Sequence, residues 1–266
     1  MNLKAETFSL NRLGLLMKRD LLSSYRAMLI RIAAASGILL IIDLMKLWQD
    51  GPTLYHHMEI FMAVLFAGGF VFTSAAFKEV HRKETNQPYL LLPASPLEKV
   101  GSRILFFTLG WIVTVAVWYT LFSLLSYAVG EILLGSHFPL HSPLHPKLFT
   151  AYAHYFVLQS IFLAGAIYFR KTNFFKTVLT LFIALILFAF IMALFVRVFF
   201  ASHFTGFFVP IESNWEVWQG VMPYHFDGLF RVMKGVGNVF YWGLMAPAAW
   251  VLTYFRFREV QVKDGI

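Results

Sequence analysis

Histidine is the residue type whose spacing in this chain comes closest to a metal-binding pattern. Three of them recur every four residues, at His137, His141 and His145. On a helix, that spacing would place the imidazoles on one face, where they could share a metal ion. Prolines interleave with them and prevent one regular helix: Pro139, Pro143 and Pro146. The sequence therefore predicts loop histidines that can titrate, and no metal site.

Motifs for catalysis are missing from the sequence. It contains no G-x-x-x-x-G-K-[ST] phosphate-binding loop, no G-x-S-x-G nucleophile elbow and no H-E-x-x-H zinc motif. It also has no cysteine, which removes disulfides and thiol nucleophiles. The deepest polar residues of its apolar segments are Asp43 and Gln159, and isolated groups of this kind are typical hydrogen-bonding residues between helices. We therefore expect no enzyme activity in the chain and no cofactor of its own.

The composition indicates lipid as the solvent for much of the chain. Hydrophobic residues make up 59% of the 266 residues and charged residues 14%. Soluble domains have roughly 45–50% apolar and about 25% charged residues. A core of this size cannot hide so much apolar surface, so we expect a membrane protein rather than a soluble one.

Six windows are long and apolar enough to cross a bilayer, which takes about 20 residues in a helix. They are 29–48, 58–77, 104–129, 151–169, 176–200 and 238–257. The predicted fold class is all-α: a polytopic membrane protein with six transmembrane helices, forming a single transmembrane domain over residues 1–266. Small residues at Gly68, Gly69 and Gly165 predict close helix contacts, and Pro247 predicts a kink in the last window.

Basic residues fall unevenly between the two sides of these windows. Sixteen Lys and Arg lie in residues 1–28, 78–103, 170–176 and 256–266, against five in the connections on the other side. Basic loops stay in the cytoplasm. Both termini and the loop 78–103 are therefore expected to be cytoplasmic, in a multi-pass protein of the cell's inner (cytoplasmic) membrane. The net charge of +8 then reflects topology and contact with the anionic lipid bilayer, not nucleic acid.

Residues 8–28 have the pattern of an interfacial amphipathic helix. Leu10, Met17 and Leu21 belong to an apolar face. The cations gather on another face, where they could contact lipid phosphates: Arg12, Lys18, Arg19 and Arg26. The alternative is a solvated start to the first span.

The loop 78–103 carries a short apolar segment between polar ones. Ser95 can cap a new helix with Pro96 at its first position and Glu98 in its first turn. An apolar patch stiffened by prolines suits docking onto another protein. The residues expected to dock are Tyr89, Leu90, Leu91, Leu92, Pro93, Ala94, Ser95, Pro96 and Glu98. The alternative is that Leu90–Leu92 tucks under the helix bundle.

Residues 201–237 contain two short helical patterns rather than one span. Ser213 and Glu216 form an S-x-x-E capping box, and Pro223 would stop that helix. A second aromatic stretch ends at Gly235 and Gly237. The pattern predicts short re-entrant or interfacial helices before the last span, with an ordinary loop as the alternative.

In its amphipathic start, its six windows and the segment from Leu91 to Lys99, the chain resembles the permease subunit of ABC type-2 transporters. The resemblance implies that the loop 78–103 forms a coupling helix seated on separate ABC ATPase subunits. It also implies a homodimer or a pairing with a related half, ATP and Mg²⁺ bound in the partner, and export. The largely uncharged span centres favour an amphiphilic or lipid-like cargo. Two other functions stay open: a gradient-driven carrier or channel, and a non-transporting scaffold of an assembly complex.

Overall fold

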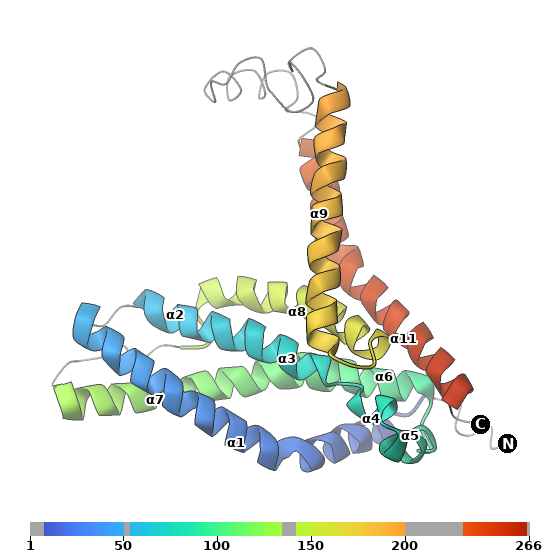
Figure 1. Ribbon diagram of the computed structural model, residues 1–266. Coiled ribbons are helices and arrows are strands. Elements are labelled where there is room, and N and C mark those ends of the chain that lie inside the picture. The colour runs from blue at the N-terminus through green and yellow to red at the C-terminus, as the bar shows by residue number, and fades with distance from the viewer. Residues whose placement is uncertain (1–7, 51–53, 135–141, 200–230, 265–266) are drawn as a thin grey trace.

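The computed structural model describes residues 8–50, 54–134, 142–199 and 231–264 (Figure 1). Within these ranges the chain is helical and contains no strand, as the all-α prediction requires. The helices follow in this order: α1 (Leu10–Asp50), α2 (Leu54–Ala63), η2 (Val64–Gly68), α3 (Gly69–Ser74), α4 (Lys78–His81), α5 (Lys83–Leu90), α6 (Pro96–Leu105), η3 (Phe106–Gly110), α7 (Trp111–Leu134), α8 (Pro146–Tyr168), α9 (Asn173–Phe199), η5 (Val239–Leu244) and α11 (Met245–Asp264).

Three of these segments, η2, η3 and η5, are π-helical turns inside longer helices. The chain runs without a break from α2 through η2 into α3, and from α6 through η3 into α7. Residues 231–238 are also helical and continue directly into η5 and α11. The prediction that Gly235 and Gly237 end a helix is therefore wrong, because a helix tolerates isolated glycines at a cost of about 1 kcal/mol each. The rest of the predicted re-entrant region, residues 201–230, lies outside the described residues.

Four described helices are long and apolar enough to cross a membrane. They are Met58–His81, Pro96–Val129, Pro146–Tyr168 and Asn173–Phe195, and they account for the second to fifth predicted windows. The first window contributes only a shorter apolar stretch, Ile32–Ile42, within α1. The sixth, in η5 and α11, is not among the four, since Trp, Tyr, Pro and Gly lower its hydropathy. Spans one and six therefore stay predictions.

A body of side-by-side helices holds the core. In Figure 1, the axes of α1, the α2–α3 helix, the α6–α7 helix and α8 are roughly aligned, although the chain runs in opposite senses along α2–α3 and α6–α7, and α11 packs against α8. One group of buried side chains includes Phe61, Tyr119 and Tyr155. A second, which includes Phe77 and Phe257, lies beside α4, α5 and the start of α6. We call the end of the body formed by those three elements the loop end.

Glycines allow the closest helix contacts in the body, as predicted. A Cβ on Gly69 would lie 2.4 Å from Cε2 of Tyr155 and 2.6 Å from Nε1 of Trp111. A Cβ on Gly165 would lie 2.0 Å from Oγ1 of Thr177. The neighbouring side chains therefore approach the backbone at distances that no side chain at these two positions would permit.

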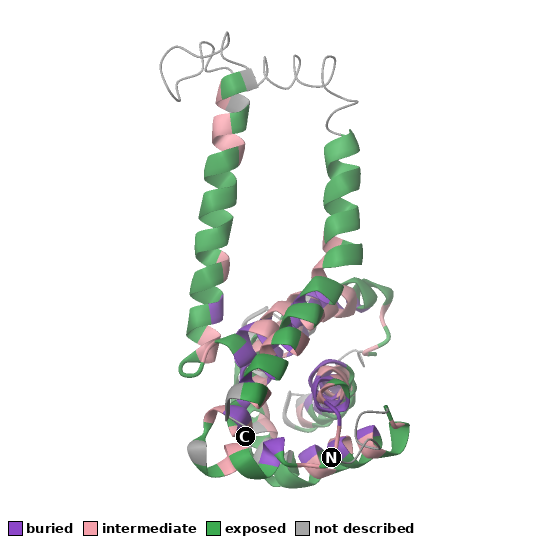
Figure 2. Cartoon of the chain, turned by 90° about the vertical axis from the view of Figure 1, so that its right-hand side faces the viewer, coloured by how far each residue is buried: buried purple, intermediate pink, exposed green. Residues whose placement is uncertain are grey.

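Helix α9 stands apart from the body. Its first turns contact α8 and α3, whereas no residue of the apolar window that it offers to a membrane is buried, and most of this helix is exposed (Figure 2). Figure 1 shows α9 running steeply across the direction of α2, α3, α7 and α8. Membrane helices tilt by at most about 40° from the bilayer normal. In this conformation the body and α9 therefore do not form one parallel set of spans.

The N-terminal segment is part of a single 41-residue helix, α1, with no break between residues 28 and 29. Leu13 and Leu16 are buried, and α1 packs against α6 and α7. Leu10, Leu21 and Tyr25 are exposed, so the apolar face predicted for lipid is free of the body. One side of this segment thus belongs to the protein core, and its contact with lipid stays a prediction.

Candidate functional site

The loop 78–103 is folded, and a capping box organises its centre. Oγ of Ser95 accepts a hydrogen bond from the Glu98 amide at 3.2 Å, and Oε2 of Glu98 accepts one from the Ser95 amide at 2.7 Å. Pro96 takes the first position of α6. This confirms the predicted helix start and fixes the direction in which α6 leaves the loop and enters the third predicted window.

Glu98 also ties the start of α1 to α6. Its fully buried carboxylate accepts a hydrogen bond from the Ser9 amide at 2.5 Å and pairs with the Arg12 guanidinium at 2.8 Å. Four donors therefore satisfy one buried charge: the amides of Ser9 and Ser95 and two N–H groups of Arg12. Hydrogen bonds to a buried charge contribute about 1.5–3 kcal/mol each, so this contact fastens the first turn of α1.

A second, partly buried charge cluster lies further along α6, around the buried Arg103. Its guanidinium pairs with Asp20 of α1 at 3.3 Å and with Glu79 of α4 at 2.9 Å. Nε of Arg103 donates to the Tyr89 hydroxyl at 3.3 Å, and Arg19 pairs with Glu79 at 3.2 Å. We call these five residues the arginine cluster. It joins α1, α4, α5 and α6 at the loop end.

Burial sets the electrostatics of the arginine cluster. It raises the pKa of the Asp20 carboxyl above its usual range, although the adjacent Arg103 guanidinium acts in the opposite direction. Burial likewise raises the pKa of the Tyr89 hydroxyl, which therefore stays neutral and accepts a hydrogen bond from Arg103. The cluster is thus a structural joint whose charges are balanced internally.

The predicted docking residues divide into buried and exposed groups. Tyr89, Leu90, Ser95 and Glu98 are buried. Leu92, Ala94 and Pro96 are partly exposed. Leu91, 72% exposed, and Pro93 point outward. The alternative that residues 90–92 tuck under the bundle describes Leu90 but not Leu91.

Leu97, which the sequence reading did not single out, is 52% exposed between Pro96 and the buried Glu98. We call Leu91, Pro93 and Leu97 the tip. Its buried neighbours are held from both sides. Leu90 belongs to the core group that contains Phe77 and Phe257, and Nζ of buried Lys99 donates to the Leu90 carbonyl at 2.7 Å. The tip therefore presents apolar side chains on a rigid base.

The four cations predicted for the interfacial helix have different environments. Arg12 pairs with the buried Glu98, and Arg19 pairs with Glu79 although both of these side chains are partly exposed. Lys18 and Arg26 are exposed. Lys18 and Arg26 are thus the two of these four cations that form no ion pair with a described carboxylate and stay open to lipid phosphates.

Away from the loop end, buried polar side chains form hydrogen bonds between helices. Oε1 of Gln159 accepts from Oγ1 of Thr108 at 2.8 Å, and its Nε2 donates to Thr73 at 3.4 Å, which confirms the hydrogen-bonding role expected for Gln159. The Asp43 side chain lies outside the described residues.

The histidines of the predicted loop do not gather in the part of the chain that the structure describes. His145 caps α8 by accepting the Lys147 amide at 3.3 Å. Nδ1 of His154 lies 2.7 Å from the Tyr241 hydroxyl. His137 and His141 lie outside the described residues, and no three possible metal ligands meet within them.

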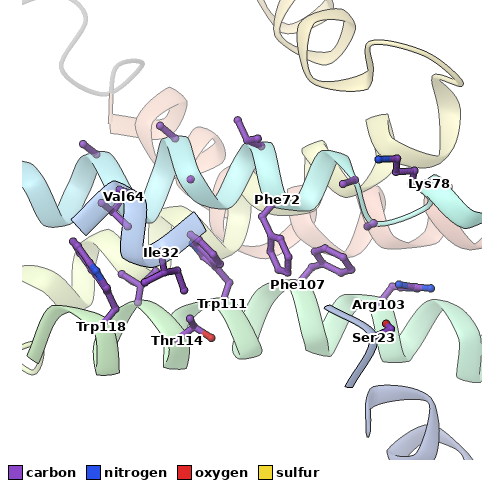
Figure 3. Close-up of a pocket in the computed structure, with 18 of the residues that line it drawn as sticks. Ser23, Ile32, Val64, Phe72, Lys78, Arg103, Phe107, Trp111, Thr114 and Trp118 are labelled. Atoms are coloured by element: carbon purple, nitrogen blue, oxygen red, sulfur yellow. The ribbon is translucent and has the colours of Figure 1, made fainter. Parts of the chain in front are cut away.

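A groove runs along the body from the loop end, with a volume of about 820 Å³ (Figure 3). It lies between α1 and the helix formed by α2, η2 and α3, with η3 and α7 along its base. Trp111 helps to shape the base, because its Nε1 donates to the Leu65 carbonyl of η2 at 3.1 Å. The groove is thus a feature of one chain.

No family model, curated protein or solved structure matches the chain. The function is therefore inferred from the geometry of the loop end and of the groove.

Sequence reasoning missed Asp20, Lys99 and Arg103. Each had a signal: Leu13, Leu16 and Asp20 recur at helical spacing, and Lys99 and Arg103 share one face of α6 just before an apolar run. Cations on that face are buried only where other groups of the chain accept their hydrogen bonds, as Asp20 and Glu79 do for Arg103 and the Leu90 carbonyl does for Lys99.

Proposed function

We propose that this chain is the membrane-spanning permease subunit of an ATP-driven transporter of the ABC type, with hydrolysis in a separate ATPase subunit. The observation that carries the proposal is the tip: apolar Leu91, Pro93 and Leu97 stand exposed on a base of buried, ion-paired residues. Exposed apolar side chains on a rigid support favour a protein partner. The absence of a phosphate-binding motif from the sequence gives the ATPase role to that partner.

The described contacts provide a route for movement from the tip into the membrane. A push on the tip acts on α6, which continues as one helix into η3 and α7. Glu98 with Arg12, and Arg103 with Asp20, attach α1 to the same helix. Movement of α6 therefore displaces α1 and the third predicted span together. A dimer, formed with a second copy or a related half, would give the exposed apolar face of α9 a partner. Export of an amphiphilic cargo is the direction that we propose.

The test is a charge on the tip. Leu91→Asp should release the ATPase subunit, because a carboxylate would have to be desolvated in an apolar contact. Leu144→Asp is the matched control, since Leu144 is 68% exposed in the turn before α8 and distant from the loop in sequence. The tagged chain would be isolated from the membranes of its own cells, and the proteins bound to it would be searched for a Walker A ATPase.

The proposal predicts such an ATPase with the unchanged chain and with Leu144→Asp, and its loss with Leu91→Asp. A chain that moves cargo along a gradient with no ATPase bound would be a carrier. A chain that binds partners through Leu91 but moves nothing would be a scaffold. Either outcome would reject the proposed function.

A further inference from the structure

The groove along the body has small side chains on one wall. Ala63, Ala67, Val71 and Ala75 line it at intervals of four residues, and all four are exposed. On a helix this spacing keeps one face free of bulk. The wall includes η2, and the base includes η3, and π-helical turns occur frequently at functional sites. The volume of about 820 Å³ lies within the range of small-molecule sites.

The groove changes character along its length. Its far part is apolar, with Trp118, Val64 and Ile32 toward one end (Figure 3). Lys78 and Arg103 lie at the other end, beside α4 and α6 (Figure 3). The groove is apolar along most of its length and has charged groups at one end. A molecule with an apolar chain and a polar head has the same distribution of polarity.

The charges at the loop end favour an anionic head. Arg103 is committed to Asp20 and Glu79. The Lys78 ammonium has no hydrogen bond or ion pair with any described residue, and it lines the groove. Three cations lie at this end, namely Lys78, Arg19 and Arg103. The carboxylates there are Asp20 and Glu79, so one positive charge is left over.

We propose that the groove binds a single amphiphile with an anionic headgroup, its apolar chain along α3 and α7 and its head at Lys78. The proposal names a cargo class and in that respect rests on the proposed function, but binding itself needs only this chain. The ligands expected to bind all carry a carboxylate or phosphate group on a long alkyl chain.

Tryptophan fluorescence gives a direct test, because Trp111 and Trp118 line the groove. The chain purified in dodecyl maltoside would be titrated with dibromostearate, whose bromines quench tryptophan on contact. We expect saturable quenching that Ala67→Phe abolishes by filling the groove. Ala128→Phe, at an exposed alanine of α7 that does not line the groove, should leave the quenching unchanged.

A second variant tests the headgroup and keeps an exposed position, so it should not affect folding. Lys78→Gln should weaken dibromostearate binding about tenfold, the loss expected for one charge-assisted hydrogen bond. Lys171→Gln, at another exposed lysine, should not. A brominated maltoside, which carries no charge, should show no difference between the two variants.

Equal quenching of Ala67→Phe and Ala128→Phe, or equal affinity of Lys78→Gln and Lys171→Gln, would overturn the proposal. Displacement of the probe by inorganic phosphate at similar concentration would identify a free-anion site instead, and would also overturn it. Failure here is separate from failure of the proposed function. A groove that binds the probe in a chain that never holds an ATPase leaves this proposal standing and removes the other.

Discussion

Arg103 is the residue on which the loop end depends most. It is 6% exposed and bridges Asp20 of α1 and Glu79 of α4. A buried ion pair adds little net stability over an apolar pair, but removing one partner leaves the other charge buried and uncompensated. The cost of losing Arg103 therefore comes mainly from the buried Asp20 carboxylate, because Glu79 keeps its pair with Arg19.

Arg103→Gln should destabilise the protein by roughly 3–5 kcal/mol, the range for an orphaned buried charge. The measurement is thermal unfolding of the purified chain in detergent. Asp20→Asn in the Arg103→Gln background should recover part of the loss, since Asp20 is the buried carboxylate that loses its ion-pair partner, whereas Glu79 keeps its pair with Arg19. Strictly additive effects would show that the two residues do not interact.

A substitution at Gly69 should also change the stability of the protein by a predictable amount. Gly69→Ala would press a methyl group onto Tyr155 and Trp111. We expect a loss of about 1–3 kcal/mol, as for overpacking of a tight core. Gly37→Ala is the control, because a Cβ there meets nothing within 4 Å, and it should leave stability unchanged or slightly higher. Equal unfolding temperatures for the two variants would contradict the close contact.

For single residues, the sequence predicted contacts between residues that lie close together along the chain. The helix start at Ser95 and Pro96 depends on neighbouring residues and formed as expected, and the structure adds the reciprocal hydrogen bonds between Ser95 and Glu98. The pairing of Glu98 with Arg12 joins positions 86 residues apart. No local pattern selects one carboxylate from fourteen acidic residues for a given arginine, because that choice depends on how the helices pack.

Among the elements, α1 gives the clearest mechanical prediction. Its first turn is held to α6 by Glu98, so Glu98→Gln should loosen that turn while preserving the shape of the side chain. Backbone amides of residues 10–16 should exchange hydrogen faster, and those of α8 should not change. Unchanged exchange in both helices would mean that Glu98 does not fasten α1.

Hydropathy located the second to fifth windows but could not settle where α1 begins to be a span. Residues 15–36 contain no glycine or proline, so nothing in the sequence breaks the helix where residues 8–28 meet 29–48. The same limitation applies to α9. Its apolar length was predictable, whereas its steep angle to α8 follows from the turn at Phe169–Asn173, where Thr172 adopts a φ of 52°.

For the whole molecule, the distribution of basic residues predicts one orientation. The chain has no cysteine, so single cysteines can report topology without background. Gln87→Cys, exposed in α5, should react with a membrane-impermeant maleimide only after the cytoplasmic side is opened. Ser142→Cys, exposed before α8, should react in intact cells. The reverse labelling pattern would place the tip outside, where no ATP is available.

The proposed transport function requires an ATPase subunit bound at the tip. Its most direct measurement is Mg²⁺-dependent ATP hydrolysis by the chain isolated in mild detergent from the membranes of its own cells. We predict hydrolysis with the unchanged chain and with Leu144→Asp, and at least tenfold less with Leu91→Asp. Full hydrolysis with Leu91→Asp, or none with the unchanged chain, would contradict the account.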